Sequence, residues 1–128
     1  MTTRRNASPE ADLQRSVARF LDEHLPDEVM WTATAPSGWL PPQVAVRFKA
    51  HGVRRGFPDL CFIIPGRGAR FCELKLTHAE SSLKPEQKAV RSILQPLGHW
   101  ALCTSVAEVA SALMSWGVVL HKSEVWHD

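Results

Sequence analysis

The sequence predicts an α/β fold in which helices flank a mixed β-sheet. Segments with apolar residues at helical spacing alternate with short runs of β-favouring residues, in the order α-β-α-β-β-α-β-α. Two of these runs lie on either side of a turn-forming segment at residues 65–68, which indicates a β-hairpin. Such an alternation is typical of a sheet covered by helices. The length of 128 residues is sufficient for one compact domain with its own core.

The N-terminal quarter is expected to hold a tail, a helix and a strand. Residues 1–7 are interpreted as a flexible tail. A helix should begin after Ser8, because serine is a favoured N-cap and Pro9 suits the first helical position. Apolar residues then recur at helical spacing until Pro26. The β-favouring run over residues 29–34 is predicted to form the first strand.

The central part is expected to form the hairpin. A loop over residues 35–42 and a short helix over 43–50 precede a glycine-bracketed basic loop over 51–57. The run LCFII at residues 60–64 and the run FCEL at 71–74 are the two predicted hairpin strands.

The C-terminal part continues the alternation. A helix is predicted over residues 85–97 and a short strand over 99–104. The next helix should open with a capping box of Ser105 and Glu108, and it should stop at Gly117.

The distribution of charge indicates the kind of partner, and the cysteine content indicates the cellular compartment. The net charge is only +2, but residues 43–70 hold a single acid, Asp59, among six basic residues, which favours a polyanion over a membrane surface. These basic residues are Arg47, Lys49, Arg54, Arg55, Arg67 and Arg70. No apolar run approaches the roughly 18 residues of a membrane span, and no signal peptide is visible. Three cysteines within predicted strands are interpreted as buried free thiols of a reducing, cytoplasmic compartment.

The hairpin carries an unusual polar set for an apolar element. Asp59 precedes the first hairpin strand (residues 60–64) and should lie opposite residues 73–75. Glu73 and Lys75 share one face of the second hairpin strand. Two carboxylates can hold Mg²⁺ or Mn²⁺, and the backbone carbonyl of Leu74 is a plausible third ligand. A lysine beside the metal can orient or deprotonate a water and stabilise charge on a phosphate. The alternative is structural: a surface ion pair between Glu73 and Lys75, with Asp59 capping a turn.

These residues resemble the VRR-NUC nucleases of the PD-(D/E)xK superfamily. The similarity rests on GVRRGFPDL at residues 52–60, FCELK at 71–75 and LKPEQ at 83–87, in family order. It covers residues 8–117, and residues 118–128 are then a C-terminal extension that adds an edge strand or a dimer contact.

The resemblance implies a restriction-endonuclease-like core and Mg²⁺- or Mn²⁺-dependent cleavage of DNA, most often branched DNA. It implies a homodimeric, Holliday-junction resolvase-like endonuclease, of phage or bacterial origin and acting in the cytoplasm. Asp59 and Glu73 would be metal ligands, Lys75 the catalytic lysine, and Gln87 a contact to the site or the scissile strand. An acid of the first helix would complete the site.

Several assignments remain open from the sequence. Glu10 is favoured as the first-helix acid, because it extends the expected buried stripe, but Asp12 competes with it. Lys84 stands where the family usually has a small N-cap residue. Arg54 and Arg55, and less strongly Arg47 and Lys49, are candidates for binding backbone phosphates. Flap- or fork-cleaving and restriction-type nucleases are alternative functions, as is an inactive nucleic-acid-binding module on the same fold.

Overall fold

The protein forms a four-stranded mixed sheet with helices on both faces. The computed structural model describes residues 8–34 and 40–121. The helices are α1 (Pro9–His24), α2 (Pro42–Ala50), α3 (Pro85–Leu94) and α4 (Val106–Ser115), with 3₁₀ turns η2 (Glu80–Ser82) and η3 (Gln95–Leu97). The strands are β1 (Met30–Ala33), β2 (Leu60–Ile64), β3 (Gly68–Leu74) and β4 (Trp100–Cys103). The sheet order is β1-β2-β3-β4, antiparallel except for the parallel pair β3/β4. The predicted elements before residue 118 are thus present, and α3 passes into η3 at Pro96.

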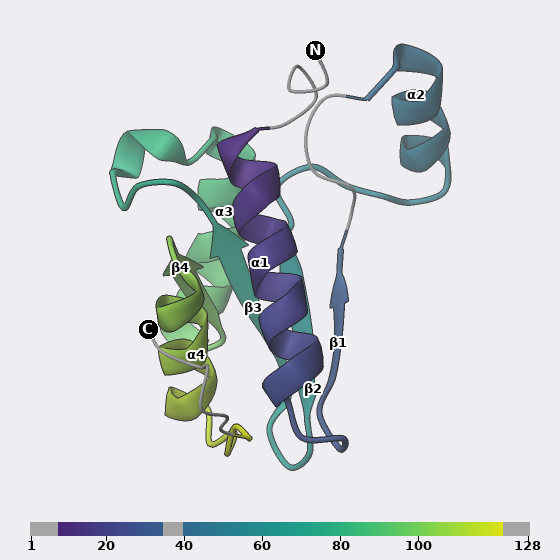
Figure 1. Cartoon of the computed structure of the whole chain (residues 1–128). Coiled ribbons are helices and arrows are strands. Elements are labelled where there is room, and N and C mark those ends of the chain that lie inside the picture. Colours follow the sequence, from purple (N-terminus) through teal and green to yellow (C-terminus); the bar gives the residue numbers. More distant parts are fainter. Residues whose placement is uncertain (1–7, 35–39, 122–128) are drawn as a thin grey trace.

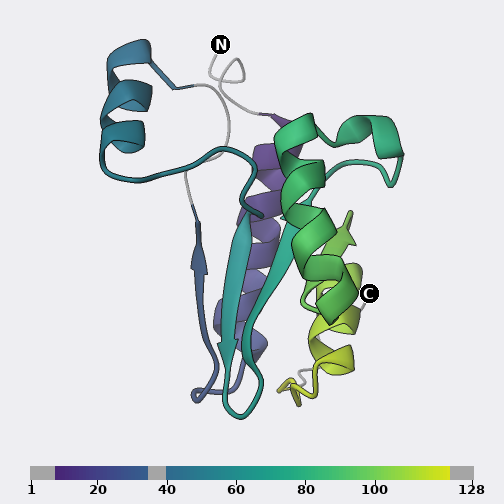
Figure 2. The same ribbon diagram turned by 180° about the vertical axis from the view of Figure 1, so that it is seen from behind.

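The two faces of the sheet are covered differently. Figure 1 shows α1 lying along one face with α4 beside it, and Figure 2 shows α3 on the opposite face. The main core lies under α1 and α4, where Val17, Leu60, Phe62, Val109 and Leu113 are completely shielded from solvent. By contrast, α2 stands apart from the sheet in both figures and none of its residues is buried.

Local signals explain where the helices begin. The Ser8 hydroxyl accepts a hydrogen bond from the backbone N–H of Ala11 (3.0 Å), as expected of an N-cap. At α4, the Ser105 hydroxyl accepts from the N–H of Glu108 (3.2 Å). The reciprocal half of the predicted capping box is shifted by one residue, because the Glu108 carboxylate accepts from the N–H of Thr104 (2.7 Å).

The predicted edge strand after α4 is wrong for residues 118–120. Val118 and Leu120 point into the main core instead, and the N–H of His121 donates to the carbonyl of His24 (2.7 Å). Burying two apolar side chains against α1 provides more stabilisation than a short exposed strand would. The folded domain therefore continues past residue 117. The predicted tail at residues 1–7 and the rest of the extension lie outside the described residues.

The cysteines differ in their environments. Cys72 and Cys103 are buried free thiols with their sulfur atoms 3.8 Å apart, as predicted. Cys61 is only half-buried, because it lies on the face that α3 covers incompletely. In the described part of the chain, no helix has both the length and the apolar character needed to cross a membrane.

The basic loop is held against the start of α3 by Gly56. This glycine has φ +90°, and a Cβ atom there would lie 2.6 Å from the carbonyl oxygen of Glu86. Glycine is therefore required both by the backbone conformation and by the close approach. The contact ties residues 51–57 to the helix that carries Gln87.

We expect Gly56→Ala to destabilise the domain more than Gly52→Ala does. Gly52 also has a positive φ, +100°, but a Cβ atom there would meet nothing within 4 Å. The strained backbone alone costs about 1–2 kcal/mol, and at Gly56 the clash with helix backbone adds to this cost. Urea denaturation of both variants measures the difference. Equal destabilisation would show that the loop does not pack on α3.

Candidate active site

Asp59, Glu73 and Lys75 come together at one end of the hairpin. Leu60 pairs with Cys72, so Asp59 lies beside the end of β3, and its Oδ2 accepts a hydrogen bond from the N–H of Leu74 (2.7 Å). Because side chains alternate along a strand, Glu73 and Lys75 point to the α3 face while Cys72 and Leu74 enter the core. The predicted juxtaposition is therefore present.

Glu73 and Lys75 are buried and Asp59 is half-buried, which is inconsistent with a surface ion pair between Glu73 and Lys75. Glu73 is 2% exposed and Lys75 is 8% exposed. The pKa of Glu73 is raised from 4.5 to about 9, mainly by burial and then by the negative charge of Asp59, while Lys75 acts in the opposite direction. Oε1 of Glu73 is buried without a hydrogen-bond partner among the described residues. Such a carboxylate is costly to bury unless a cation or a proton compensates it.

The raised pKa of Glu73 predicts how stability depends on pH in the absence of metal. The folded state keeps the Glu73 proton up to about pH 9, whereas the unfolded chain releases it near 4.5. Stability from this group is complete below pH 4.5 and is lost as pH rises toward 9. Thermal melts in EDTA between these values should show a falling melting temperature, and Glu73→Gln should flatten the slope. An unchanged slope in that variant would contradict the assignment.

Gln87 connects α3 to the cluster. Its Nε2 donates to Oε2 of Glu73 (3.2 Å), and its Oε1 accepts from the backbone N–H of Lys84 (2.8 Å). The side chain of Lys84 makes no capping hydrogen bond. The helix start is instead capped by the Gln87 side chain, which accepts from the Lys84 backbone N–H. Gln87 is thus held at both ends, and it fixes one oxygen of Glu73.

If the cluster holds a metal ion, Gln87→Ala should weaken metal binding by about 10- to 100-fold, because Gln87 orients one carboxylate of the cluster. It should also remove a helix-start hydrogen bond worth about 1 kcal/mol. Ser105→Ala is the matched control, since it removes a cap from α4, away from Glu73. Calorimetric Mg²⁺ titrations and melting temperatures of both variants separate the two effects. If both variants lose the same fraction of metal affinity, Gln87 acts only through stability.

The first-helix acids lie outside the buried stripe. Glu10 was predicted to extend that stripe but is exposed, because it sits in the first turn of α1 beyond the edge of the core. It is still close enough for its charge to raise the pKa of Glu73. Asp12 is exposed and forms an ion pair with Arg15. Of these two acids, Glu10 is the one whose charge acts on Glu73.

The donors at the cluster fit a hard divalent cation. Across residues 8–34 and 40–121, no group of three or more His, Cys, Asp and Glu side chains lies close enough to hold a metal. Mg²⁺, however, is commonly bound through one or two carboxylates and retains several waters. Asp59 and Glu73 meet that requirement. The N–H of Leu74 faces Asp59, and the carbonyl of a strand residue points to the same side as its N–H, so this carbonyl is a suitable third oxygen.

The predicted phosphate-binding residues lie on exposed surfaces around the loop. Arg47 and Lys49 are exposed on α2, and Arg54 and Arg55 are exposed on the loop after it. The Arg54 guanidinium donates to the carbonyls of Lys49 (3.2 Å) and Val53 (3.4 Å). These four side chains are not part of the buried cluster.

Sequence reasoning missed Thr34. Its backbone N–H donates to the carbonyl of Asp59 (3.0 Å), and its hydroxyl donates to the carbonyl of Pro58 (2.5 Å). Thr34 therefore fixes the segment that presents the Asp59 carboxylate. The only signal was its place as the last residue of the predicted strand over 29–34.

Comparison with solved structures identifies a similar fold. A protein described as a VRR_NUC domain protein superimposes with a TM-score of 0.60 and 21% sequence identity, over 87% of this chain and 89% of that chain. No protein-family model matches the sequence, and no curated protein is detectably similar to it. The chain thus has the fold of a VRR-NUC domain, and the predicted α/β fold class is confirmed.

Proposed function

We propose that this chain is a VRR-NUC endonuclease that hydrolyses phosphodiester bonds in DNA with the help of Mg²⁺ or Mn²⁺. The observation that carries the proposal is the buried carboxyl of Glu73 beside the half-buried Asp59 and the buried Lys75, on a VRR-NUC fold. A structural role would not require the unpartnered Oε1 of Glu73 or a carboxyl pKa near 9. An acid with a raised pKa, such as Glu73, that the fold places beside a second carboxylate and a lysine is typical of functional sites.

Each residue has a distinct role in this proposal. A divalent ion held by Asp59, Glu73 and the Leu74 carbonyl would supply Lewis acidity toward the phosphate. Leu74 N–H fixes the orientation of Asp59, and Gln87 fixes that of Glu73. Lys75 orients the attacking water and compensates the negative charge that develops on the phosphate.

The partner in this proposal is branched DNA, and the active species is a homodimer in the cytoplasm. Four exposed basic side chains would contact backbone phosphates, which gives affinity without sequence preference: Arg47, Lys49, Arg54 and Arg55. One site cuts one strand, so symmetric resolution of a four-way junction needs two copies of the chain. Sedimentation at micromolar concentration, with and without junction DNA, tests the dimer, and a monomer in both conditions would rule it out.

The decisive experiment compares cleavage of labelled four-way junction, fork, 5′ flap, duplex and single strand in Mg²⁺, Mn²⁺ and EDTA. Asp59→Asn removes a proposed ligand, and Glu80→Gln is a control because Glu80 is an exposed acid paired with Arg91. We expect paired cuts in the junction that need metal, disappear in Asp59→Asn and persist in Glu80→Gln. Cutting confined to flaps or forks would keep the site but exclude the resolvase. Binding without cutting would identify an inactive module.

A further inference from the structure

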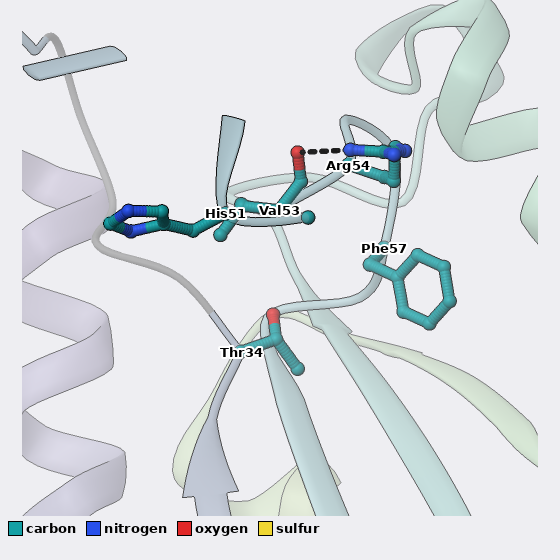
Figure 3. Close-up of a pocket in the computed structure, with 6 residues that line it drawn as sticks. Thr34, His51, Val53, Arg54 and Phe57 are labelled. Atoms are coloured by element: carbon teal, nitrogen blue, oxygen red, sulfur yellow. Dashed lines mark hydrogen bonds between the residues drawn. The ribbon is translucent and has the colours of Figure 1, made fainter. Parts of the chain in front are cut away.

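A hollow beside the cluster has the features of a nucleobase site. It has a volume of about 400 Å³ and is lined by Thr34, His51, Gly52, Val53, Arg54 and Phe57. Figure 3 shows His51 and Phe57 on opposite sides of this hollow, with Thr34 at the end of β1 below it. Its volume lies within the usual range for small-molecule sites.

Phe57 provides an aromatic surface that is left open. The side chain is 52% exposed, although it precedes the buried Pro58. Its ring is supported by an edge-to-face contact with Phe71, with centroids 6.4 Å apart. A half-exposed but supported aromatic ring is a suitable platform for stacking a base.

The rest of the hollow matches the polar edge of a base. Val53 adds an apolar wall, and Arg54 is fixed at the rim by its hydrogen bonds to two backbone carbonyls. Thr34 adds a hydroxyl that donates to the carbonyl of Pro58 and can still accept a hydrogen bond, and His51 closes the side opposite Phe57 with its ring directed away from Phe57. A flat ligand with apolar faces and a polar edge suits this combination.

The hollow is joined to the proposed active site through its floor. Thr34 is hydrogen-bonded to both Pro58 and Asp59, and Phe57 precedes Asp59 by two residues. Phe71 lies on the same face of β3 as Glu73, since the two are separated by one residue. A nucleotide next to a phosphate at Asp59 and Glu73 would therefore have Phe57 within reach of its base.

We propose that this hollow binds one unpaired base of the DNA substrate, stacked on Phe57, next to the scissile phosphate. This inference rests on the proposed function and adds a basis for preferring branched DNA. A base held within a duplex is stacked and paired, so it cannot enter the hollow without being extruded. Forks and junctions that expose an unpaired nucleotide avoid that cost.

The test measures binding to a fork with one unpaired 2-aminopurine and to a duplex of the same sequence. The full chain carrying Lys75→Met, which the proposed function makes inactive, is used in Mg²⁺ at one salt concentration. Quenching of 2-aminopurine reports stacking. When Phe57→Ala or Phe57→Leu is combined with Lys75→Met, fork binding should weaken by about 5- to 150-fold and duplex binding by less than about twofold. Phe57→Trp should retain binding and quenching.

Ile63→Ala is the matched control, because Ile63 is an apolar side chain of similar exposure, 47%, and does not line the hollow. The base site would be overturned if the Phe57 variants lost the same affinity for fork and duplex, or if both variants bound the fork as before. If the wild-type chain cuts DNA in these cases, the proposed function stands and only the base site fails. If it neither cuts nor binds any DNA, both proposals fail.

Discussion

Replacing Glu73 by glutamine is expected to reduce DNA cleavage by about 10³-fold or more and to leave the domain folded. Loss of a metal ligand removes several kcal/mol of charge stabilisation from the transition state. The amide is nearly isosteric, and it has no charge to desolvate at a position only 2% exposed. Because burial and Asp59 oppose ionisation of Glu73, glutamine should make the metal-free protein equally stable or more stable above pH 5.

Three measurements check this result: cleavage rate, thermal stability in EDTA, and Mg²⁺ binding by calorimetry. Glu73→Ala is the comparison, because it leaves a cavity and removes the partner of Gln87, so it should lose both cleavage and stability. A Glu73→Gln variant that is unfolded would mean that the carboxyl is structural. A variant that still cuts at the normal rate would exclude Glu73 as a ligand.

The sheet and its polar cluster could be predicted because their signals are local. Apolar alternation and the turn at residues 65–68 define the hairpin, and the spacing along it places Asp59 opposite Glu73. The alternation of side chains also predicts that Glu73 and Lys75 share a face. These positions follow from backbone geometry and need no knowledge of tertiary packing.

The features that sequence reasoning missed depend on packing between distant segments. Periodicity places Glu10 on the stripe of α1, but only the extent of the core decides that its first turn stays exposed. Likewise, Val118 and Leu120 alternate as a strand would, yet the space beside α1 accepts them as core residues. The contact of Gly56 with Glu86, which brings the basic loop to α3, involves residues 30 positions apart.

Lys75→Met is expected to reduce cleavage strongly without preventing metal binding, which distinguishes the role of the lysine from that of the two carboxylates. Lys75 is 8% exposed, and methionine retains most of its apolar stem. Removing the ammonium takes away the group that orients water and compensates phosphate charge, so cleavage should fall by about 10²- to 10⁴-fold. Lys75→Arg keeps the charge but changes its position, and should recover little activity.

The pH dependence of Mg²⁺ binding provides a second test of the role of Lys75. The charge of Lys75 lowers the pKa of Glu73, so its removal should raise that pKa further. Metal must displace the Glu73 proton, and Mg²⁺ binding in Lys75→Met should therefore need a higher pH than in the wild type. Calorimetric titrations at several pH values measure this shift. A variant that binds Mg²⁺ at the wild-type pH and still cuts would show that Lys75 acts on neither the carboxylate nor the phosphate.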